Sequence, residues 1–405
     1  MKLKKSAYAL NMVGLLTLTN LVYAAPAPSD IIVVGDTKHD ISIPIRDVPK
    51  FSSHAKKGNS GFSLEKILQK NLAFLQISNF QGIGVGLGSY AVTTPAPDLS
   101  FSVGMTQALE WVDPDIAIFD KATGTVAAGF PKPGSAVWYG FGGPCETEDS
   151  GKPIVKYDQL ANRWVISRQA NADPNTGPFY QCVAISTSED ATDSYYRYAF
   201  PTDSLNNYAK MGLWSDAYYL ATFLTGPVSH GARACALDRD KMLLGLAATA
   251  QCKQMTTDES GPLTPADLEG ATQTPGLPGY FFSIEAPHDL LLFKFHVDFA
   301  NPANTTFTSA ISLPVQPFIS PCSSLNGTAC VVQPNTTNKL DILVDRFSSR
   351  IKYHQFENYG SILLAHNIEG PPPKLAPAIR WYELRVANNP QANPTIYQQA
   401  TYAPD

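Results

Sequence analysis

The chain has 405 residues, a formal net charge of −5 and 44% hydrophobic residues. Its 20 Phe, 18 Tyr, 28 Gly and 32 Pro favour many short strands and turns over long helices. Because the balance is acidic and no run of Lys or Arg is present beyond the N-terminus, we expect neither a nucleic acid nor an anionic membrane as partner.

Residues 1–25 have the pattern of a secretory signal peptide. Three lysines precede an apolar stretch over 7–21, and Val22-Tyr23-Ala24 fits a cleavage site of small residues. Loss of these lysines would take the net charge to about −8. No later segment has the ~18 unbroken apolar residues of a membrane helix. We therefore expect a mature chain without a transmembrane segment that is secreted, periplasmic or attached to the cell surface.

Residues 26–75 differ in composition and are predicted to form an N-terminal extension and linker. The run at 31–34 is typical of a strand, 56–61 of a linker, and the apolar spacing over 62–75 predicts a short helix. The glycine-dense run at 81–88 lacks the third glycine of a dinucleotide fingerprint, so it does not indicate a cofactor site.

The following region repeats one pattern, in which an apolar strand ends in aspartate and a tight polar turn leads to a second apolar run. The pattern occurs at Asp120, Asp158, Asp238 and Asp298. Repeats at such spacing are typical of a propeller or another array, in which each unit adds its own layer of core. We predict an all-β fold with a β-propeller domain over 76–405 and about five to seven blades. A propeller usually closes by pairing its terminal strands, so 31–34 or 76–90 would complete the ring unless the chain is short at its C-terminus.

The cysteines indicate disulfides. Six cysteines in an exported chain allow 15 pairings. Because an array has mainly neighbour contacts, we predict sequential pairing. The predicted pairs are Cys145–Cys182, Cys235–Cys252 and Cys322–Cys330.

Several stretches resemble a group of largely uncharacterised exported bacterial β-propeller proteins. Examples are Phe119-Asp120-Lys121-Ala122-Thr123-Gly124 and Arg380-Trp381-Tyr382-Glu383-Leu384-Arg385, and the resemblance extends over 95–405. It implies the fold and an exported location but no activity. The chain departs from the group at 98–101 and at Lys152, and members of the group usually continue past residue 405.

The candidate ligand-binding residues lie where inner strands are expected to begin, since those ends of a propeller surround its central channel. They are Lys152, Trp214, Asp216, Asp345 and Arg346. The alternative for the charged ones is a set of ion pairs between blades, such as Asp216 with Lys152. The catalytic residues stay unknown, because a glycosidase needs two carboxylates at a defined separation that a sequence does not give.

No other motif in the sequence indicates a particular reaction or bound group. The seven histidines lack the spacing of metal ligands, so we predict no metal and no cofactor. The tryptophans at 111, 138, 214 and 381 would stack on sugars if exposed, although packing between blades is the alternative. His296 alternates out of an apolar strand and is expected to be a solvent-facing or hydrogen-bonded strand residue rather than a catalytic base.

Three functions follow from this pattern. The first is an exported binding or adhesion module for a glycan or a protein surface, since many loops are carried on a rigid scaffold. The second is an extracellular carbohydrate-active hydrolase or lyase that uses channel carboxylates such as Asp216 and Asp345. The third is a truncated, inactive copy.

Overall fold

The computed structural model of the protein describes residues 30–49, 79–84, 98–148, 151–225, 230–256, 260–323, 329–342, 345–348, 350–371 and 376–403. The expected signal peptide, the linker at 56–61 and the helix at 62–75 lie outside these ranges. Within them, no helix is long and apolar enough to cross a membrane.

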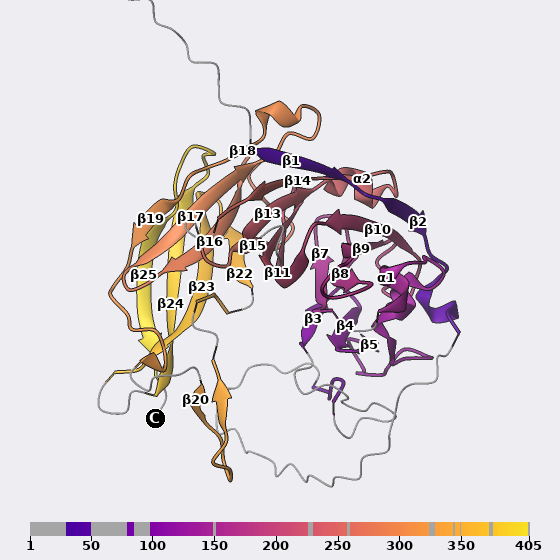
Figure 1. Cartoon of the computed structure of the whole chain (residues 1–405), viewed down its shortest axis with the longest axis horizontal. Coiled ribbons are helices and arrows are strands. Elements are labelled where there is room, and N and C mark those ends of the chain that lie inside the picture. The colour runs from indigo at the N-terminus through magenta and orange to yellow at the C-terminus, as the bar shows by residue number, and fades with distance from the viewer. Residues whose placement is uncertain are drawn as a thin grey trace, which may run out of the picture.

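The described chain is all-β and forms five successive antiparallel sheets that follow one another around an arc (Figure 1). The first contains β3 (Ser100–Val103), β4 (Gln107–Val112), β5 (Asp115–Asp120) and β6 (Lys132–Pro133). The second contains β7 (Ile154–Asp158), β8 (Arg163–Asn171), β9 (Phe179–Ser186) and β10 (Tyr195–Thr202). The third contains β11 (Leu205–Leu213), β12 (Tyr218–Thr225), β13 (Gly231–Leu237) and β14 (Thr249–Gln254).

The last two sheets share a parallel contact between their first strands, β15 and β22. The fourth contains β15 (Thr264–Glu269), β16 (Gly279–Glu285), β17 (Asp289–His296), β18 (Thr306–Phe307) and β19 (Ile311–Pro314). The fifth contains β22 (Ile351–Gln355), β23 (Tyr359–Glu369), β24 (Pro377–Ala387) and β25 (Thr395–Tyr402). A separate hairpin joins β20 (Ala329–Val332) and β21 (Lys339–Asp341). This arrangement confirms the predicted β-propeller, with five blade-like sheets in the described ranges.

The helical elements are short. They are η1 (Ile45–Asp47), η2 (Gly134–Trp138), α1 (Pro144–Thr147), α2 (Arg239–Leu243) and η3 (Pro302–Asn304).

The core is divided into layers between neighbouring sheets. Along β8, Trp164 and Ile166 belong to the layer shared with the first sheet, whereas Val165 belongs to the layer shared with the third. This alternation is the two-residue period of a strand that is covered on both faces. A third layer joins the third, fourth and fifth sheets and includes Tyr219, Phe281 and Tyr353. Each sheet is therefore stabilised mainly by its neighbours, as an array predicts.

The five first strands, β3, β7, β11, β15 and β22, lie next to one another in that order. Their approach is close: a Cβ on Gly212 of β11 would lie 2.1 Å from the Ala266 carbonyl oxygen of β15. At the other end of the series, the Arg350 guanidinium donates to the Phe101 carbonyl of β3 and, at 3.2 Å, to the Val155 carbonyl of β7. We call these five strands the inner strands.

The repeated aspartates fix the turns that follow their strands. Asp120 Oδ1 accepts from the backbone N–H groups of residues 122 and 123, and Asp158 Oδ1 accepts from those of residues 160 and 161. Asp298 makes the same bonds to residues 300 and 301, and Asp238 accepts from the Lys241 N–H at the start of α2. The pattern thus marks turns that are closed by side-chain acceptors.

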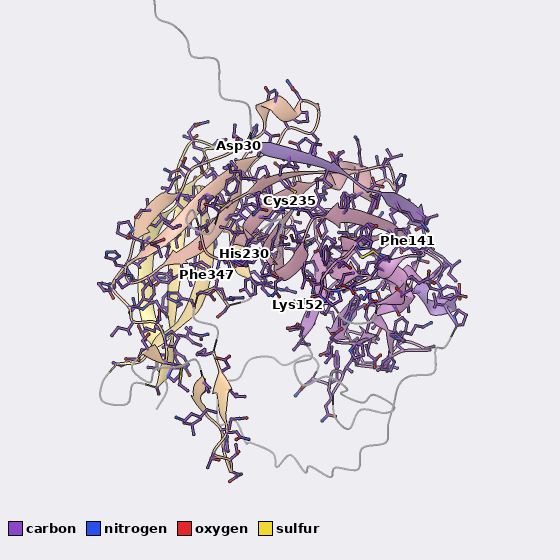
Figure 2. The ribbon with its side chains drawn as sticks, in the orientation of Figure 1. Asp30, Phe141, Lys152, His230, Cys235 and Phe347 are labelled. Atoms are coloured by element: carbon purple, nitrogen blue, oxygen red, sulfur yellow. A yellow bond between two sulfur atoms is a disulfide. The ribbon has the colours of Figure 1, made fainter. Side chains whose placement is uncertain are left out.

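The structure confirms the three predicted disulfides (Figure 2). Cys145–Cys182 joins α1 to β9, and Cys235–Cys252 joins directly opposed positions of β13 and β14. Cys322–Cys330 joins residue 322 to β20. No cysteine of the described ranges is free.

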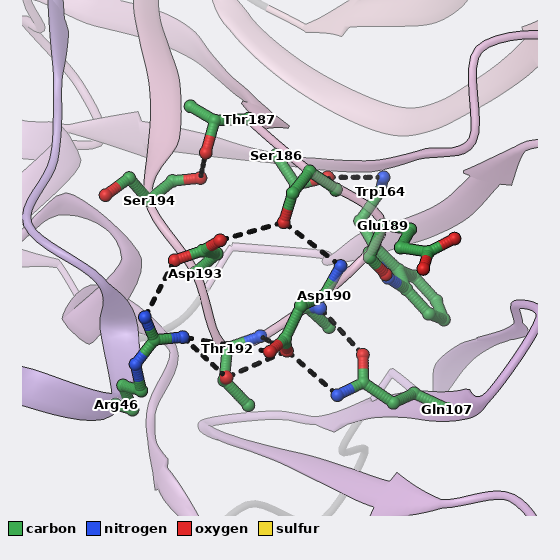
Figure 3. A network of polar contacts seen from close by, with 12 residues as sticks. Arg46, Gln107, Trp164, Ser186, Thr187, Glu189, Asp190, Thr192, Asp193 and Ser194 are labelled. Carbon is green, nitrogen blue, oxygen red and sulfur yellow. Dashed lines mark hydrogen bonds and ion pairs between the residues drawn. The ribbon is translucent and has the colours of Figure 1, made fainter.

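The N-terminal strands lie along the outside of the sheets. The run at 31–34 belongs to strand β1 (Ile31–Gly35), which pairs with β14, and β2 (Lys38–Ile41) pairs with β10 (Figure 1). The expectation that 31–34 closes the ring is therefore wrong, because this strand occupies the outer edge of the third sheet. Arg46 in η1 then bonds Asp193 at 3.0 Å, and Gln107 of β4 bonds Asp190 at 2.9 Å (Figure 3).

Candidate functional site

A cavity of about 410 Å³ lies where the inner strands begin. All five inner strands, or the residues just before them, contribute to its lining, and Lys152 lies on the concave side of the arc (Figure 2). We call it the central pocket. A concave site of this size, shared by several elements, is the usual place for a small ligand.

The backbone around the central pocket is unusual. Seven non-glycine residues of the described ranges have positive φ, and four of them line this pocket. They are Asp98 (39°), Lys152 (54°), Tyr208 (52°) and Arg350 (72°), from four different inner-strand regions. Such conformations cost of order 1 kcal/mol or more each and gather at ligand sites. This concentration marks the pocket as a candidate functional site.

Tyr208 lies in a β-bulge of β11, where the pairing with β12 shifts between Asn207 and Lys210. Its hydroxyl donates to the Phe347 carbonyl at 2.9 Å, which fixes the ring. The Arg346 guanidinium lies 4.3 Å from the ring centroid and the Lys210 ammonium 4.6 Å from it. Burial raises the pKa of Tyr208 to about 12, so it remains a phenol. The bulge therefore places the Tyr208 ring in the pocket within cation–π distance of Lys210 from the same strand and of Arg346 from the segment before β22.

A second cavity of about 200 Å³, the lower cavity, continues between the inner strands and shares Lys156 and Arg350 with the central pocket. Lys156 Nζ donates to Asp267 Oδ2 at 2.6 Å, and both side chains are buried. Lys352 Nζ lies 3.7 Å from Asp267, and the Leu213 N–H donates to its other oxygen at 3.0 Å. This network joins β7, β11, β15 and β22 across the channel.

The charge states in this network follow from burial and pairing. Burial lowers the pKa of Lys156 to about 8, although Asp267 opposes the shift. Burial acts to raise the pKa of Asp267, but Lys156 and Lys352 hold it below its usual range. Burial also lowers the pKa of Lys210. Asp267 is therefore an ionised counter-charge at neutral pH.

Two of the five candidates from the sequence line the central pocket. Lys152 donates to the Asn207 side-chain oxygen, and Arg346 makes two bonds to Asp345, at 2.6 and 2.9 Å. Asp345 is half exposed beside the pocket. The structure thus brings Lys152, Arg346 and Asp345 into one region.

Trp214 and Asp216 lie elsewhere, at the turn between β11 and β12. The Trp214 ring is fully buried, donates to the Leu277 carbonyl and packs edge-on against Tyr280 and Tyr353. Asp216 accepts from the Tyr219 hydroxyl at 3.3 Å, and burial raises its pKa to about 6. Lys152 and Asp216 thus bond to other partners, Asn207 and Tyr219, and do not form the pair weighed above.

Three of the other tryptophans, Trp111, Trp138 and Trp164, are fully buried, which rules out sugar stacking on their faces. Trp381 of β24 is only partly buried. His296 is exposed, as its alternation predicted. Over the described ranges, no three His, Cys, Asp or Glu side chains are grouped as metal ligands.

Sequence reasoning missed most residues of these two cavities. Among them are Lys156, Tyr208, Lys210, Asp267 and Arg350. A signal was present at Lys156, a charged residue within the otherwise buried strand Ile154–Asp158. The bulge that re-aims Tyr208 and Lys210 has no clear signature in the sequence.

The fold and the pocket define a β-propeller with a cation-lined central cavity. No protein-family model and no curated protein matches the sequence. Solved structures match over about three quarters of the chain. An exo-1,5-alpha-L-arabinanase from a bovine ruminal metagenomic library has 8% identity and a TM-score of 0.33, and the match covers 76% of this chain and 100% of that one. A GH43 endo-arabinanase from Bacillus licheniformis has 12% identity and a TM-score of 0.30, over 74% and 96%.

An alpha-L-arabinanase from Cellvibrio cellulosa, solved with arabinohexaose, has 10% identity and a TM-score of 0.25, over 74% of this chain and 95% of that one. Similarity at this level concerns the arrangement of strands alone, and it carries no argument about what this chain binds.

Proposed function

We propose that the protein is exported and that its central pocket binds an extracellular glycan. The observation that carries this proposal is the meeting of five inner strands at one cavity of about 410 Å³, whose lining includes four residues with positive φ. A cavity of this size suits one or two sugar units and is too small for a protein surface. A glycan is therefore the better of the two partners that the sequence suggested.

The lining has both surfaces that a sugar needs. Leu99, Ile154 and Met211 supply apolar contacts for the C–H face of a pyranose or furanose ring. Lys152 and Asn207 supply a donor and an amide at the rim for hydroxyl groups. Apolar walls with a few placed polar groups are typical of small-molecule sites.

The disulfides support export. Three disulfides and no free cysteine in the described ranges are typical of proteins from oxidising compartments. This agrees with the signal-like pattern of residues 1–25.

Hydrolysis of the glycan is the second candidate function, and Asp216 is the observation that favours it. A glycosidase needs one protonated and one ionised carboxyl group on either side of the scissile bond. The pKa of Asp216, raised by burial to about 6, leaves part of its population protonated near neutral pH. However, Asp216 does not line the central pocket, where Asp98 is the carboxylate of the described lining. The geometry therefore supports binding more than cleavage.

The test measures binding and turnover on the same purified protein. Oligosaccharides from plant and bacterial cell walls are titrated calorimetrically, and released reducing ends are assayed in parallel. We expect binding that Lys152→Ala weakens about tenfold, with Lys339→Ala, in the exposed hairpin strand β21, as the matched control. Folded protein that binds no oligosaccharide would overturn the proposal.

Reducing-end release that Asp216→Asn abolishes at unchanged affinity would replace binding by hydrolysis as the function. Reducing-end release that persists in Asp216→Asn would instead make Asp98 the candidate catalytic carboxylate.

A further inference from the structure

The central pocket concentrates positive charge in an acidic protein. Five cationic side chains line it, whereas the chain as a whole has a net charge of −5. The cations are Lys152, Lys156, Lys210, Arg346 and Arg350, and the described lining contains one carboxylate, Asp98. A concave surface of one sign focuses its field on the space inside it.

Two of these cations are neutralised by carboxylates of the chain. Lys156 is paired with Asp267 at 2.6 Å, and Arg346 with Asp345 at 2.6 Å. Their charge is already balanced, so they do not by themselves require a ligand.

The other three cations have no carboxylate as close, although the Asp98 charge favours the charged form of Lys210 from a greater distance. No described carboxylate lies within ion-pair distance of Lys152, Lys210 or Arg350. Lys152 contacts a neutral amide, Lys210 lies over the Tyr208 ring, and Arg350 donates one nitrogen to two carbonyls. A cation that is partly removed from water gains from an oxyanion more than from these neutral partners.

We infer that the ligand of the central pocket is an acidic sugar, whose oxyanion is bound by Lys152, Lys210 and Arg350. This inference rests on the proposed function and names the substrate class of the same site. The oxyanion is the shared chemistry of two sources: the carboxylate of a uronic acid and the sulfate ester of a sulfated sugar. Both present oxygen acceptors to ammonium and guanidinium donors, and the sugar ring keeps the apolar contacts described above.

The experiment compares ligands that differ in charge alone. Calorimetry measures the binding of oligogalacturonate, of the same oligomer as its neutral methyl ester, of a sulfated galactan oligomer and of a neutral arabino-oligosaccharide. We expect an oxyanionic oligomer to bind at least about tenfold more tightly than the neutral ester. Raising the salt from 20 to 300 mM is expected to remove much of that difference. The acidic oligomer that binds shows whether the oxyanion is the carboxylate of a uronic acid or a sulfate ester.

Substitutions test which of the cations bind the oxyanion. Lys210→Met is expected to lose about tenfold in affinity for the acidic oligomer while changing affinity for the neutral ester little. Lys152→Met also removes the donor to sugar hydroxyl groups, so it is expected to weaken both ligands, and the acidic oligomer more than the neutral ester. Lys339→Met serves as the surface control, and the melting temperature reports whether each variant is folded. Lys152→Arg, which keeps the charge, is expected to retain most of the affinity even if the two methionine variants fold poorly.

The outcomes separate the two proposals. Binding of neutral oligosaccharides with equal affinity, or affinity that does not respond to salt, overturns the acidic ligand and leaves glycan binding standing. Binding of inorganic sulfate or citrate, without binding of any oligosaccharide, overturns glycan binding itself.

Discussion

Two lysines of the central pocket titrate closer to neutrality than an exposed lysine, because burial lowers the pKa of Lys156 to about 8 and lowers that of Lys210. The charged groups that face them are Asp267, Arg350 and Lys352 around Lys156, and Asp98, Lys152 and Arg346 around Lys210. A lysine is charged below its pKa, so Lys156 loses its positive charge as the pH rises through about 8, and Lys210 loses its charge at a lower pH than an exposed lysine does. Loss of the Lys156 charge leaves Asp267 less balanced beside the pocket, so affinity for an acidic oligosaccharide should fall as the pH rises through about 8.

Calorimetric titrations at several pH values measure this dependence. Lys156→Met, which removes one titrating group, should flatten the profile. Affinity that stays constant or rises toward pH 9 would show that neither lysine contributes to anion binding.

Asp267 illustrates how much one buried residue contributes to stability. Its removal in Asp267→Asn would leave the buried Lys156 ammonium without its counter-charge, so we expect a loss of about 3–5 kcal/mol in the free energy of unfolding. The matched control is Glu269→Gln on the same strand. Glu269 is half exposed where it contacts Lys352, and its loss should cost about 0–1 kcal/mol. Urea unfolding distinguishes the two, and equal losses would contradict the central role of Asp267.

The pattern of an apolar strand that ends in aspartate occurs both at an exposed turn and at a buried one. Asp120 lies in an exposed turn and bonds only that turn. Asp158 closes the equivalent turn, but its other oxygen also accepts from Tyr218 of β12 at 2.9 Å and from Arg239 of α2, which follows β13, at 2.9 Å. The same residue type therefore stabilises a local turn in one sheet and a contact between sheets in the next.

Asp158→Ala should accordingly cost about 3–5 kcal/mol, because it leaves the buried Arg239 with only the exposed Asp240 as a counter-charge, at 3.7 Å. Asp120→Ala should have a much smaller effect, limited to its turn. Thermal unfolding of the two variants measures the difference. Comparable melting temperatures would mean that the buried Asp158 contacts add little beyond the turn bonds.

Features that depend on residues close in the chain could be predicted from the sequence. These features are the Asp120-type turns and the three disulfides. The Lys156–Asp267 pair joins residues 111 positions apart, and its existence depends on which inner strands become neighbours. The bulge at Tyr208 depends on a pairing shift against β12 that composition does not encode. Lys152 and Arg346 were found because charges before apolar strands stand out, whereas Lys210 lies inside β11.

At the scale of the whole molecule, β1 and β2 connect the second and third sheets from outside. Asp40 of β2 binds the buried Arg197 guanidinium through two bonds of 2.7 Å each. Asp40→Ala should therefore lower the free energy of unfolding by about 2 kcal/mol, since a charged donor loses its acceptor in a buried place. Asp30, which is largely exposed beside Lys253, is the matched control, and Asp30→Ala should have almost no effect. Chemical denaturation tests the pair, and an unchanged midpoint for Asp40→Ala would indicate that β2 is held by backbone bonds alone.

The outer position of these two strands also sets an order of events during synthesis. A chain made from its N-terminus presents β1 and β2 before the sheets that they join, because the partners of Thr37 and Asp36 lie 162 and 212 residues later. Until β1 and β2 pair with them, the outer edges of β14 and β10 stay open. Open strand edges bind other strands indiscriminately, so the nascent protein passes through a stage in which it is most exposed to aggregation.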